Sequence, residues 1–422
     1  MIILLVGSGG REHAIARAIK NSPLTSKLFI TPGNPGMQKL GECKNITVDD
    51  IEGLCNLAKL IEANLVIIGP EVPLVKGLKN KLNNIGIKAF GPTAEAAMLE
   101  GSKTFSRNFC KKYNIPQPTF NYFTDIELAL AEVEKLNGYC VVKADGLAAG
   151  KGVVICDNKE QAQLACEEML SNKKFGQSGS KILIEERISG REASIFVVSD
   201  GHDFKLLGTA QDHKRAFDND RGPNTGGMGA VSPAPTLNQK ILQKIIQDIV
   251  EPTIKGMHLE NKNYEGILYI GVMITDDGPK LIEYNCRFGD PEAQVILPLL
   301  DTDILEIMLK SLDKDLKNCL IKLKNKKSIT VVLANRGYPN EFEKNKIIPN
   351  ISSFDNDDDI IIFHAGTSLN RKNELIATGG RVLCITSISD TIESCRKKAY
   401  YTIDKINWSE GFYRKDIGKL SI

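Results

Sequence analysis

The chain has 422 residues, of which 25% are charged and 42% are hydrophobic, and its formal net charge is only +2. This length exceeds one ordinary core and predicts two to four domains. The small net charge gives no basic face for nucleic acid, and no apolar stretch approaches the ~18 residues of a membrane-spanning helix. We therefore expect a cytoplasmic protein that binds neither nucleic acid nor membrane.

The cysteines and histidines give no sign of a metal or disulfide framework. The ten cysteines contain no C-x-x-C pair, and the five histidines form no cluster. Most of the cysteines stand in apolar runs such as "YCVVKA", which is typical of small buried side chains. We therefore expect neither a zinc site nor structural disulfides.

The first hundred residues alternate short β-branched runs with amphipathic helical stretches, which predicts a parallel sheet with crossover helices. The turn Gly7-Ser8-Gly9-Gly10 follows the first strand and exposes backbone amides at a helix start. A dinucleotide fingerprint needs a small residue where Glu12 stands. Loops at 31–36 and 69–71 also follow strands, so these strand ends predict a ligand site other than a dinucleotide site.

The rest of the chain is predicted to contain a strand-rich middle and a final α/β unit. From about 119 to 210 the pattern is strand-rich with one helix at 159–170, and a long helix covers 237–257. A hairpin over 266–288 turns at Asp276-Asp277-Gly278. The Lys-rich stretch 312–327 is interpreted as a linker or surface helix. The fold class is α/β, with an α+β middle. The predicted domains are 1–101, 102–312 with a lid-like subdomain at about 120–190, and 326–422.

The stretch "VVKADGLAAGKGVVI" at 141–155 has the composition of a phosphate-binding loop. Lys143 ends a strand, small residues follow, and Lys151 stands just before the next strand. Backbone amides of such a loop can contact polyphosphate oxygens while lysines supply charge. A Walker A loop would open a helix and carry a different spacing. The alternative is a plain β-hairpin with surface lysines.

Two further strands carry polar side chains suited to a nucleotide and a metal ion. Glu185 ends an apolar strand and can accept from an adenine amino group, and Glu192 can reach ribose hydroxyls after the turn. Glu283 and Asn285 share one strand face, where two oxygen ligands suit Mg²⁺ with phosphates completing the shell. Arg287 follows on that face and can neutralise a phosphoryl group. Solvated glutamates and a polar edge strand are the alternatives.

These three stretches, in this order, resemble the ATP-grasp ligases. The motifs "VGSGGREHA", "LEGSK", "QDHKR", "GPNTGGMGA", "EYNCRFGDPE" and "YRKDIG" are similar, more narrowly, to the phosphoribosylamine-glycine ligase family, from Met1 to about Gly418. The resemblance implies a Rossmann-like, substrate-binding pre-ATP-grasp domain, an ATP-grasp domain with a lid and a small C-terminal domain. It implies that ATP converts glycine to an acyl phosphate, which 5-phosphoribosylamine attacks to give glycinamide ribonucleotide, ADP and phosphate in the second step of purine biosynthesis.

The resemblance also implies site residues. The expected ATP contacts are Lys103, Lys143, Gly150, Lys151, Gly152, Glu185, Ile188 and Glu192. Glu283 and Asn285 would hold one Mg²⁺ or Mn²⁺ ion, because no acid stands near Gly271 to hold a second. The expected catalytic residues are Arg287, Lys143 and Lys214.

The amino-acid and phosphoribosylamine contacts are assigned in the same way. Asp290 and Glu292 are expected to bind the glycine ammonium, or alternatively to cap the next helix. The polar loop 211–230 adds the candidates His213, Lys214, Arg215, Asn224 and Thr225, with His213 as a general base or only a hydrogen-bond donor. Phosphoribosylamine is expected to contact Gly9, Gly10, Glu71, His364 and Arg381, although Arg381 could instead be a surface arginine.

Three classes of protein remain to be compared. A nicotinamide oxidoreductase rests only on the opening glycine turn, and Glu12 weakens it. A different carboxylate-amine ligase would share the ATP residues but not the first and last domains. A non-catalytic nucleotide sensor would not need Lys143, Glu283 and Asn285 intact. We expect a monomer or weak oligomer that acts on ATP, glycine and 5-phosphoribosylamine.

Overall fold

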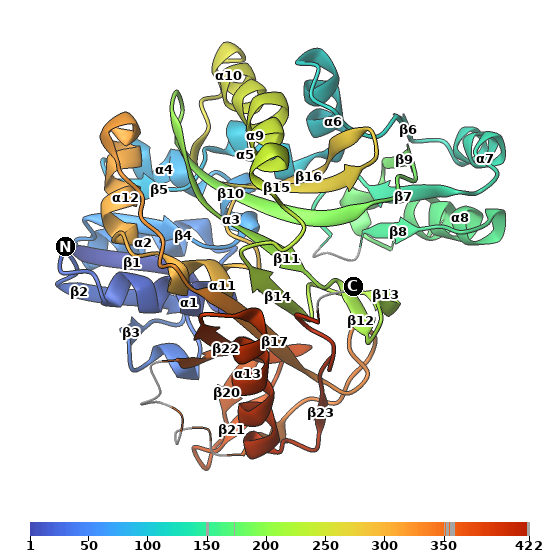
Figure 1. Ribbon diagram of the computed structural model, residues 1–422. Coiled ribbons are helices and arrows are strands. Elements are labelled where there is room, and N and C mark those ends of the chain that lie inside the picture. The colour runs from blue at the N-terminus through green and yellow to red at the C-terminus, as the bar shows by residue number, and fades with distance from the viewer. Residues whose placement is uncertain (149–151, 173, 350, 352–353, 355–358, 420–422) are drawn as a thin grey trace.

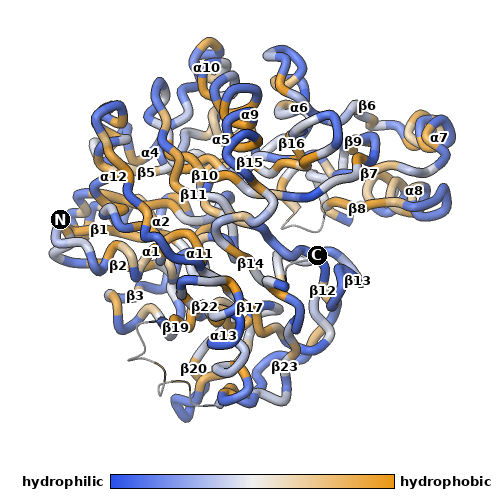
Figure 2. Tube along the Cα trace, viewed as in Figure 1, coloured by the Kyte–Doolittle hydropathy of each residue, from blue (hydrophilic) through white to orange (hydrophobic). Residues whose placement is uncertain are grey.

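The computed structural model describes residues 1–148, 152–172, 174–349, 351, 354 and 359–419. Figure 1 shows the N-terminal strands at the left, β6 to β9 at the right and the C-terminal strands below, with β10, β15 and β16 running between them. In Figure 2 the apolar residues concentrate along the N-terminal strands and along β10 and β15. Among the helices of the described residues, none combines the length and apolarity needed to cross a bilayer.

The N-terminal unit is a five-stranded parallel sheet in the order β3-β2-β1-β4-β5. Strand β1 is buried from Ile3 to Val6 because β2 and β4 flank it and helices cover its faces, which accounts for its continuous apolar run. The predicted parallel sheet with crossover helices is confirmed. The elements are β1 (Ile2–Gly7), α1 (Gly10–Lys20), β2 (Lys27–Pro32), β3 (Glu42–Cys43), α2 (Ile51–Leu60), β4 (Leu65–Ile68), α3 (Glu71–Val75), α4 (Leu78–Asn84), β5 (Ala89–Phe90) and α5 (Ala94–Gly101).

Helix α6 (Lys103–Lys112), capped by Ser102, leads into a separate antiparallel sheet in the order β6-β9-β7-β8. We call residues 120–186 the lid unit. Among the described residues, its hydrophobic core, which includes Val133, Val142 and Ile184, shares no member with the other cores. Its elements are β6 (Phe120–Phe123), α7 (Ile126–Lys135), β7 (Cys140–Ala144), β8 (Val153–Ile155), α8 (Lys159–Cys166) and β9 (Ile182–Glu186). The expectation of a single helix in this region was wrong, because α7 is a second one.

A nine-stranded sheet forms the centre of the molecule, in the order β16-β15-β10-β11-β14-β17-β22-β19 with β23 beside β17. Because β14 pairs antiparallel with β17, the final part of the chain continues this sheet. The predicted hairpin at 266–288 is confirmed as β15 and β16. The strands are β10 (Arg191–Asp200), β11 (Phe204–Asp212), β14 (Gly229–Ser232), β15 (Glu265–Thr275), β16 (Gly278–Asn285), β17 (Lys327–Asn335), β19 (Ile360–His364), β22 (Arg381–Ser389) and β23 (Gly411–Phe412).

Helices and short strands complete this part of the fold. A two-stranded hairpin, β12 (Arg215–Phe217) and β13 (Arg221–Asn224), projects from the sheet between β11 and β14. The predicted long helix at 237–257 is present as α9 and α10 joined by a π-helical turn. The other elements are α9 (Gln239–Ile245), α10 (Glu251–Leu259), α11 (Ala293–Ile296), α12 (Ile304–Leu312), β18 (Lys346–Ile347), β20 (Thr367–Leu369), β21 (Leu375–Ala377) and α13 (Ile392–Ile406).

Candidate active site

A cavity of about 1280 Å³ lies where the N-terminal unit, the lid unit and the nine-stranded sheet meet. It is larger than the ~300–1,000 Å³ typical of a site for one small ligand, so it has room for more than one substrate. The predicted residues on its wall are Glu71, Lys103, Lys143, Gly152, Glu185, Ile188, Glu192, His213, Lys214, Arg215, Asn224, Thr225, Glu283, Asn285, Arg287, Asp290, Glu292 and Arg381. Gly9, Gly10 and His364 are not on this wall, and Gly150 and Lys151 lie outside the described residues.

Lys143 belongs to a buried ion-pair cluster with Glu185 and Arg107. Its Nζ lies 2.7 Å from Glu185 Oε2, and Arg107 donates from Nε and Nη2 to the two Glu185 oxygens at 2.7 and 2.9 Å. Burial alone would raise the pKa of Glu185, but the two cations lower it to about 2. The carboxylate therefore stabilises the fold above pH 4.5 and loses that effect as the pH falls towards 2. These contacts orient Lys143, and the adenine contact of Glu185 stays a prediction.

Lys103, the other predicted phosphate-binding lysine, stands at the first position of α6. Its Nζ donates to the carbonyl oxygen of Gly146 at 3.2 Å, and Gly146 lies in the loop after β7. Burial lowers the pKa of Lys103, with Glu283 and Asp145 opposing that shift. The start of α6 and the glycine loop are thereby held together on the cavity wall.

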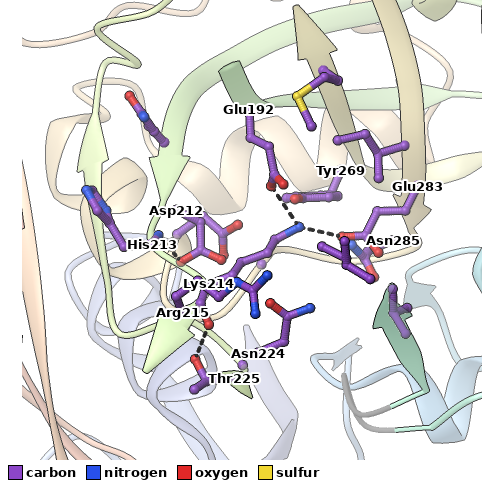
Figure 3. A pocket seen from close by; sticks show the side chains of 18 of the residues that line it. Glu192, Asp212, His213, Lys214, Arg215, Asn224, Thr225, Tyr269, Glu283 and Asn285 are labelled. Carbon is purple, nitrogen blue, oxygen red and sulfur yellow. Dashed lines mark hydrogen bonds and ion pairs between the residues drawn. The ribbon is translucent and has the colours of Figure 1, made fainter. Parts of the chain in front are cut away.

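Lys214 connects the predicted ribose-binding and metal-binding residues (Figure 3). Its Nζ lies 3.2 Å from Glu192 Oε2 and 3.2 Å from Glu283 Oε1. Burial would raise the pKa of Glu283, but Lys214 and Lys143 lower it to about 2, so the carboxylate is ionised. Asn285 also lines the cavity from the same strand, β16. One carboxylate and one amide oxygen suit a hard cation that takes its remaining ligands from phosphate and water.

Arg287, just after strand β16, contacts the N-terminal unit. Its Nε lies 3.1 Å from Glu71 Oε2, and its Nη2 lies 2.8 Å from Glu100 Oε1. Burial would raise the pKa of Glu71, but Arg287 and Arg11 lower it to about 2. At Glu100 burial prevails and raises the pKa to about 7. Glu100 was not predicted from the sequence. The available signal was an acid inside the apolar end of a helix, in "AAMLEG".

Asp212 and Glu292 are two acids on the cavity wall, of which Glu292 is buried and Asp212 half-buried. Burial and mutual repulsion raise the pKa of Asp212 well above its ordinary value, and burial raises that of Glu292. Glu292 stands at the N-cap position of α11 but makes no side-chain capping hydrogen bond there. Asp212 was missed, although an acid directly after an apolar strand was visible in the sequence.

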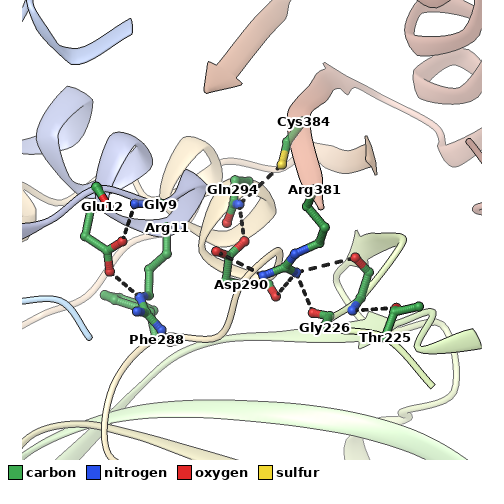
Figure 4. A network of polar contacts seen from close by, with 12 residues as sticks. Gly9, Arg11, Glu12, Thr225, Gly226, Phe288, Asp290, Gln294, Arg381 and Cys384 are labelled. Atoms are coloured by element: carbon green, nitrogen blue, oxygen red, sulfur yellow. Dashed lines mark hydrogen bonds and ion pairs between the residues drawn. The ribbon is translucent and has the colours of Figure 1, made fainter. Parts of the chain in front are cut away.

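Asp290 and Arg381 pair with each other across the domain junction (Figure 4). Arg381 Nη2 lies 3.2 Å from Asp290 Oδ2, and its Nη1 donates to the carbonyl oxygens of Gly226 and Asp290. Burial would raise the pKa of Asp290, but Arg381 lowers it. Asp290 also accepts from Gln294 Nε2 at 2.7 Å. Arg381 is therefore not a free surface arginine, and it holds the loop that contains Gly226.

The anion bound at the opening glycine turn is a side chain of the same chain, the carboxylate of Glu12 (Figure 4). The Glu12 carboxylate accepts from the Gly9 N–H at 2.8 Å and also contacts Arg11. A Cβ added at Gly7 would lie 2.2 Å from Glu12 Cγ, and one at Gly69 would lie 2.5 Å from the same atom. The glycines therefore make room for Glu12, so the prediction that the Gly9 amide faces a ligand anion is corrected.

The two predicted histidines lie in buried surroundings. The backbone N–H of His364 donates to His13 Nδ1 at 2.9 Å, and the His364 ring contacts Thr367 Oγ1 at 3.0 Å, so this residue joins β19 to α1. His213 lines the cavity, and burial and Arg414 lower its pKa to about 4. It is neutral at physiological pH. Among the described side chains and backbone groups its Nδ1 finds no hydrogen-bond partner.

Comparisons with known proteins agree with this geometry. The phosphoribosylglycinamide synthetase profile matches as an N domain over 1–100, an ATP-grasp (A) domain over 101–293 and a C domain over 328–420. Proteins named phosphoribosylamine–glycine ligase from Brucella melitensis and Vibrio vulnificus are 43% and 44% identical, covering 99% and 100% of this chain and 97% and 99% of theirs.

Solved structures extend the comparison to the fold. The crystal structure of the Thermotoga maritima phosphoribosylamine–glycine ligase is 32% identical, with a TM-score of 0.86, and the match covers 99% of this chain and 100% of that one. The biotin carboxylase domain of a Hydrogenobacter thermophilus 2-oxoglutarate carboxylase, solved with MgADP and bicarbonate, shares the fold at 15% identity and a TM-score of 0.72 over 98% and 91% of the chains. The chain belongs to the phosphoribosylglycinamide synthetase family of ATP-grasp enzymes.

Proposed function

We propose that this chain ligates glycine to 5-phosphoribosylamine, with ATP converted to ADP and phosphate, as a step of purine biosynthesis. The observation that carries the proposal is a single cavity that combines nucleotide, metal and amino-acid residues. Lys143 and Glu192 represent the nucleotide side, Glu283 and Asn285 the metal side, and Asp212 with Glu292 the amino-acid side. Names of relatives that match this chain over their full length support the same reaction.

The reaction proceeds in two displacements. A carboxylate oxygen of glycine attacks the γ-phosphorus of ATP, the bond to the β-phosphate oxygen breaks, and ADP leaves. The amine of phosphoribosylamine then attacks the acyl carbon, the amide bond forms, and inorganic phosphate leaves with the electron pair and takes up the proton that the amine loses. Neither displacement needs a protein nucleophile, so the side chains act through positioning and charge.

Different charged side chains of the cavity wall would contact different substrates. Lys103 and Lys143 would contact the ATP phosphates, and Arg287 and Lys214 would neutralise the acyl phosphate and the departing phosphate. Glu283 and Asn285 would hold Mg²⁺ or Mn²⁺, which when bound neutralises phosphate charge. The remaining predicted ATP contacts are Gly150, Lys151, Gly152, Glu185, Ile188 and Glu192.

Glycine and phosphoribosylamine would lie on the N-terminal side of the cavity. The ammonium of glycine would lie between Asp212 and Glu292 and offset their mutual repulsion, with Asp290 as a further carboxylate. Phosphoribosylamine would approach between the strand ends of the N-terminal sheet and the loop held by Arg381. Of its predicted contacts, Glu71 and Arg381 line the cavity, whereas the Gly9 amide is bound by Glu12 and Gly10 and His364 lie outside the residues that line it.

The test is ADP release that requires both glycine and phosphoribosylamine, measured for the wild type and for Glu283→Ala. We expect the variant to lose at least about 100-fold in kcat, because one metal ligand and one fixed charge disappear together. Chelation of divalent cations should abolish turnover, and adding back Mg²⁺ or Mn²⁺ separately should show which ion is preferred.

The matched control is Glu393→Ala, which removes an exposed glutamate that pairs with Lys397 and is not among the residues lining the cavity. It should keep wild-type kinetics. Unchanged turnover in Glu283→Ala would overturn the metal assignment. ADP release with amino acids other than glycine would point to a different carboxylate-amine ligase.

A further inference from the structure

The C-terminal segment Tyr413–Gly418 reaches the active-site cavity from the last domain. Arg414, Asp416 and Gly418 line the cavity, although about 200 residues of chain separate them from the hairpin β12–β13 opposite. Helix α13 fixes the segment, because Tyr400 Oη donates to the Arg414 carbonyl at 2.8 Å and accepts from the Ile417 N–H at 3.1 Å. The segment is therefore a held part of the wall.

Arg414 is the centre of this contact. Its side chain is 1% exposed, and it donates from Nε and Nη2 to the two oxygens of Asp416 at 2.8 and 2.7 Å. Its Nη1 donates to the carbonyl oxygen of Arg215 at 3.1 Å and to Asp220 at 2.7 Å. A planar guanidinium can make these four bonds at once, which a lysine cannot. Arg414 thus connects its own segment to both the base and the tip of the hairpin.

Backbone contacts reinforce this connection at the hairpin tip. The Asn219 N–H donates to Asp416 Oδ2 at 2.8 Å, and the Lys415 N–H donates to Asp218 Oδ1 at 2.7 Å. Asn219 and Asp220 have φ of 59° and 51°, in the left-handed region. Two successive residues hold this conformation only where the surroundings favour it. The C-terminal segment supplies such surroundings.

The base of the hairpin carries Lys214. The carbonyl oxygen of Lys214 accepts from both the N–H and the Oγ1 of Thr225 at 2.8 Å, which closes the hairpin at that point. The Lys214 Nζ then reaches Glu192 and Glu283, each at 3.2 Å. A rotation of the hairpin would move this ammonium relative to both carboxylates.

We propose that Arg414 is a positioning residue for the ligase reaction, which holds the hairpin 215–224 through Arg215 and Asp220 and so fixes the place of Lys214 in the cavity. This proposal rests on the proposed role of Lys214. Arg414 acts through main-chain and carboxylate contacts and touches no reacting atom.

The first experiment compares Arg414→Met, Arg414→Lys and the wild type in the full-length enzyme. A misplaced catalytic group lowers turnover by about 100-fold, so kcat of Arg414→Met should fall by roughly 10- to 100-fold. The dissociation constant for ADP should change by less than about twofold, since Lys103, Lys143 and Ile188 are not touched. Arg414→Lys keeps the positive charge but loses the planar guanidinium with its paired donors. Its kcat should therefore lie between that of Arg414→Met and that of the wild type.

The second experiment changes residues at the tip of the hairpin and leaves the buried Arg414 in place. Asp218→Ala with Asp220→Ala removes the hairpin's side-chain contacts to the segment, and Asp220 is 71% exposed, so folding should be kept. We expect kcat to fall by about 3- to 10-fold with an unchanged Tm. The control is Asp390→Ala, which removes a 78% exposed carboxylate paired with Lys326 in the same domain. Wild-type kcat in the folded double variant would overturn the proposal, even if Arg414→Met failed to fold.

Lys214→Met separates this proposal from the proposed function. If Lys214→Met keeps wild-type turnover, the assigned role of Lys214 is wrong and the positioning proposal falls with it. If Lys214→Met is inactive while folded Arg414→Met and the double aspartate variant keep wild-type kcat, Lys214 is needed and Arg414 does not position it.

Discussion

Three cations of the cavity wall each lie against a carboxylate of the same chain. Lys143 pairs with Glu185, Lys214 with Glu283, and Arg381 with Asp290. A buried charge without a partner is costly, so these pairs keep the site folded as well as charged. The residue types were predictable because phosphate and metal chemistry requires them. Their partners were not, since each pair joins segments that are distant in sequence.

The protonation state of His213 bears on its role, which the sequence left open between a general base and a hydrogen-bond donor. Its pKa is about 4 in the folded protein, against an ordinary value of 6.5. The unfolded state therefore binds the proton first, and the folding free energy contributed by this neutral side chain is lost as the pH falls from 6.5 to 4. Denaturant titrations should show a smaller acid loss of stability in His213→Gln than in the wild type.

The activity profile of the same variant separates the two roles considered for this histidine. A side chain that stays neutral near neutral pH cannot provide an inflection there, so the shape of the kcat/KM profile should be the same in His213→Gln and the wild type. Loss of an inflection near pH 7 in the variant would instead identify His213 as the general base.

At the scale of elements, strands and their ends were the most predictable features. The run ending at Lys143, the next strand at Val153 and the β15–β16 hairpin follow their sequence patterns. Helix α7 was missed because Ile126, Leu128 and Leu130 alternate with other residues, as in a strand. In the structure Leu128 is 62% exposed, so the alternation does not mark a buried face.

The contact between Gly10 of helix α1 and Gln294 of helix α11 gives a testable prediction. A Cβ at Gly10 would lie 2.5 Å from Gln294 Nε2, which in turn holds Asp290. Gly10→Val should therefore displace α11 and raise the KM for phosphoribosylamine by about tenfold or more, with little change in the KM for ATP. Steady-state kinetics with each substrate varied in turn will measure this.

Gly86→Ala is the control for a general loss of stability. A Cβ there meets nothing within 4 Å, but φ is +77°, so the variant should lose about 1 kcal/mol of folding free energy. Its KM values should match the wild type. An equal rise of both KM values in Gly10→Val would contradict the assignment of the phosphoribosylamine site to this junction.

At the scale of the whole molecule, hydrophobic cores cross the predicted domain boundaries. One cluster joins Ile3 of the N-terminal unit, Phe196 of the central sheet and Val332 and Phe363 of the last unit. Composition and strand order predicted the α/β class and the N-terminal sheet, and the family motifs predicted the ATP-grasp arrangement. The continuation of one sheet from β14 into β17 was not predictable, since pairing partners depend on tertiary packing. The domain boundaries stay predictions.

This shared core predicts that the last unit does not fold by itself. Residues 326–422 expressed alone would expose the β17 edge that pairs with β14 and the apolar side chains that face the other units. We expect aggregation on size exclusion and no cooperative thermal transition. Residues 119–187, whose core is separate, are the control and should unfold cooperatively. A monomeric, cooperatively unfolding 326–422 fragment would contradict this account.

The Glu12 carboxylate in the opening turn has a consequence for the alignment of the two sheets. In a nucleotide-binding protein the anion at such a turn exchanges with solution, whereas here it is part of helix α1 and cannot leave. The neighbouring Arg11 donates to the carbonyl oxygen of Phe288, just beyond the strand that carries Glu283 and Asn285. The turn is therefore a permanent spacer that sets the separation between the N-terminal strand ends and strand β16.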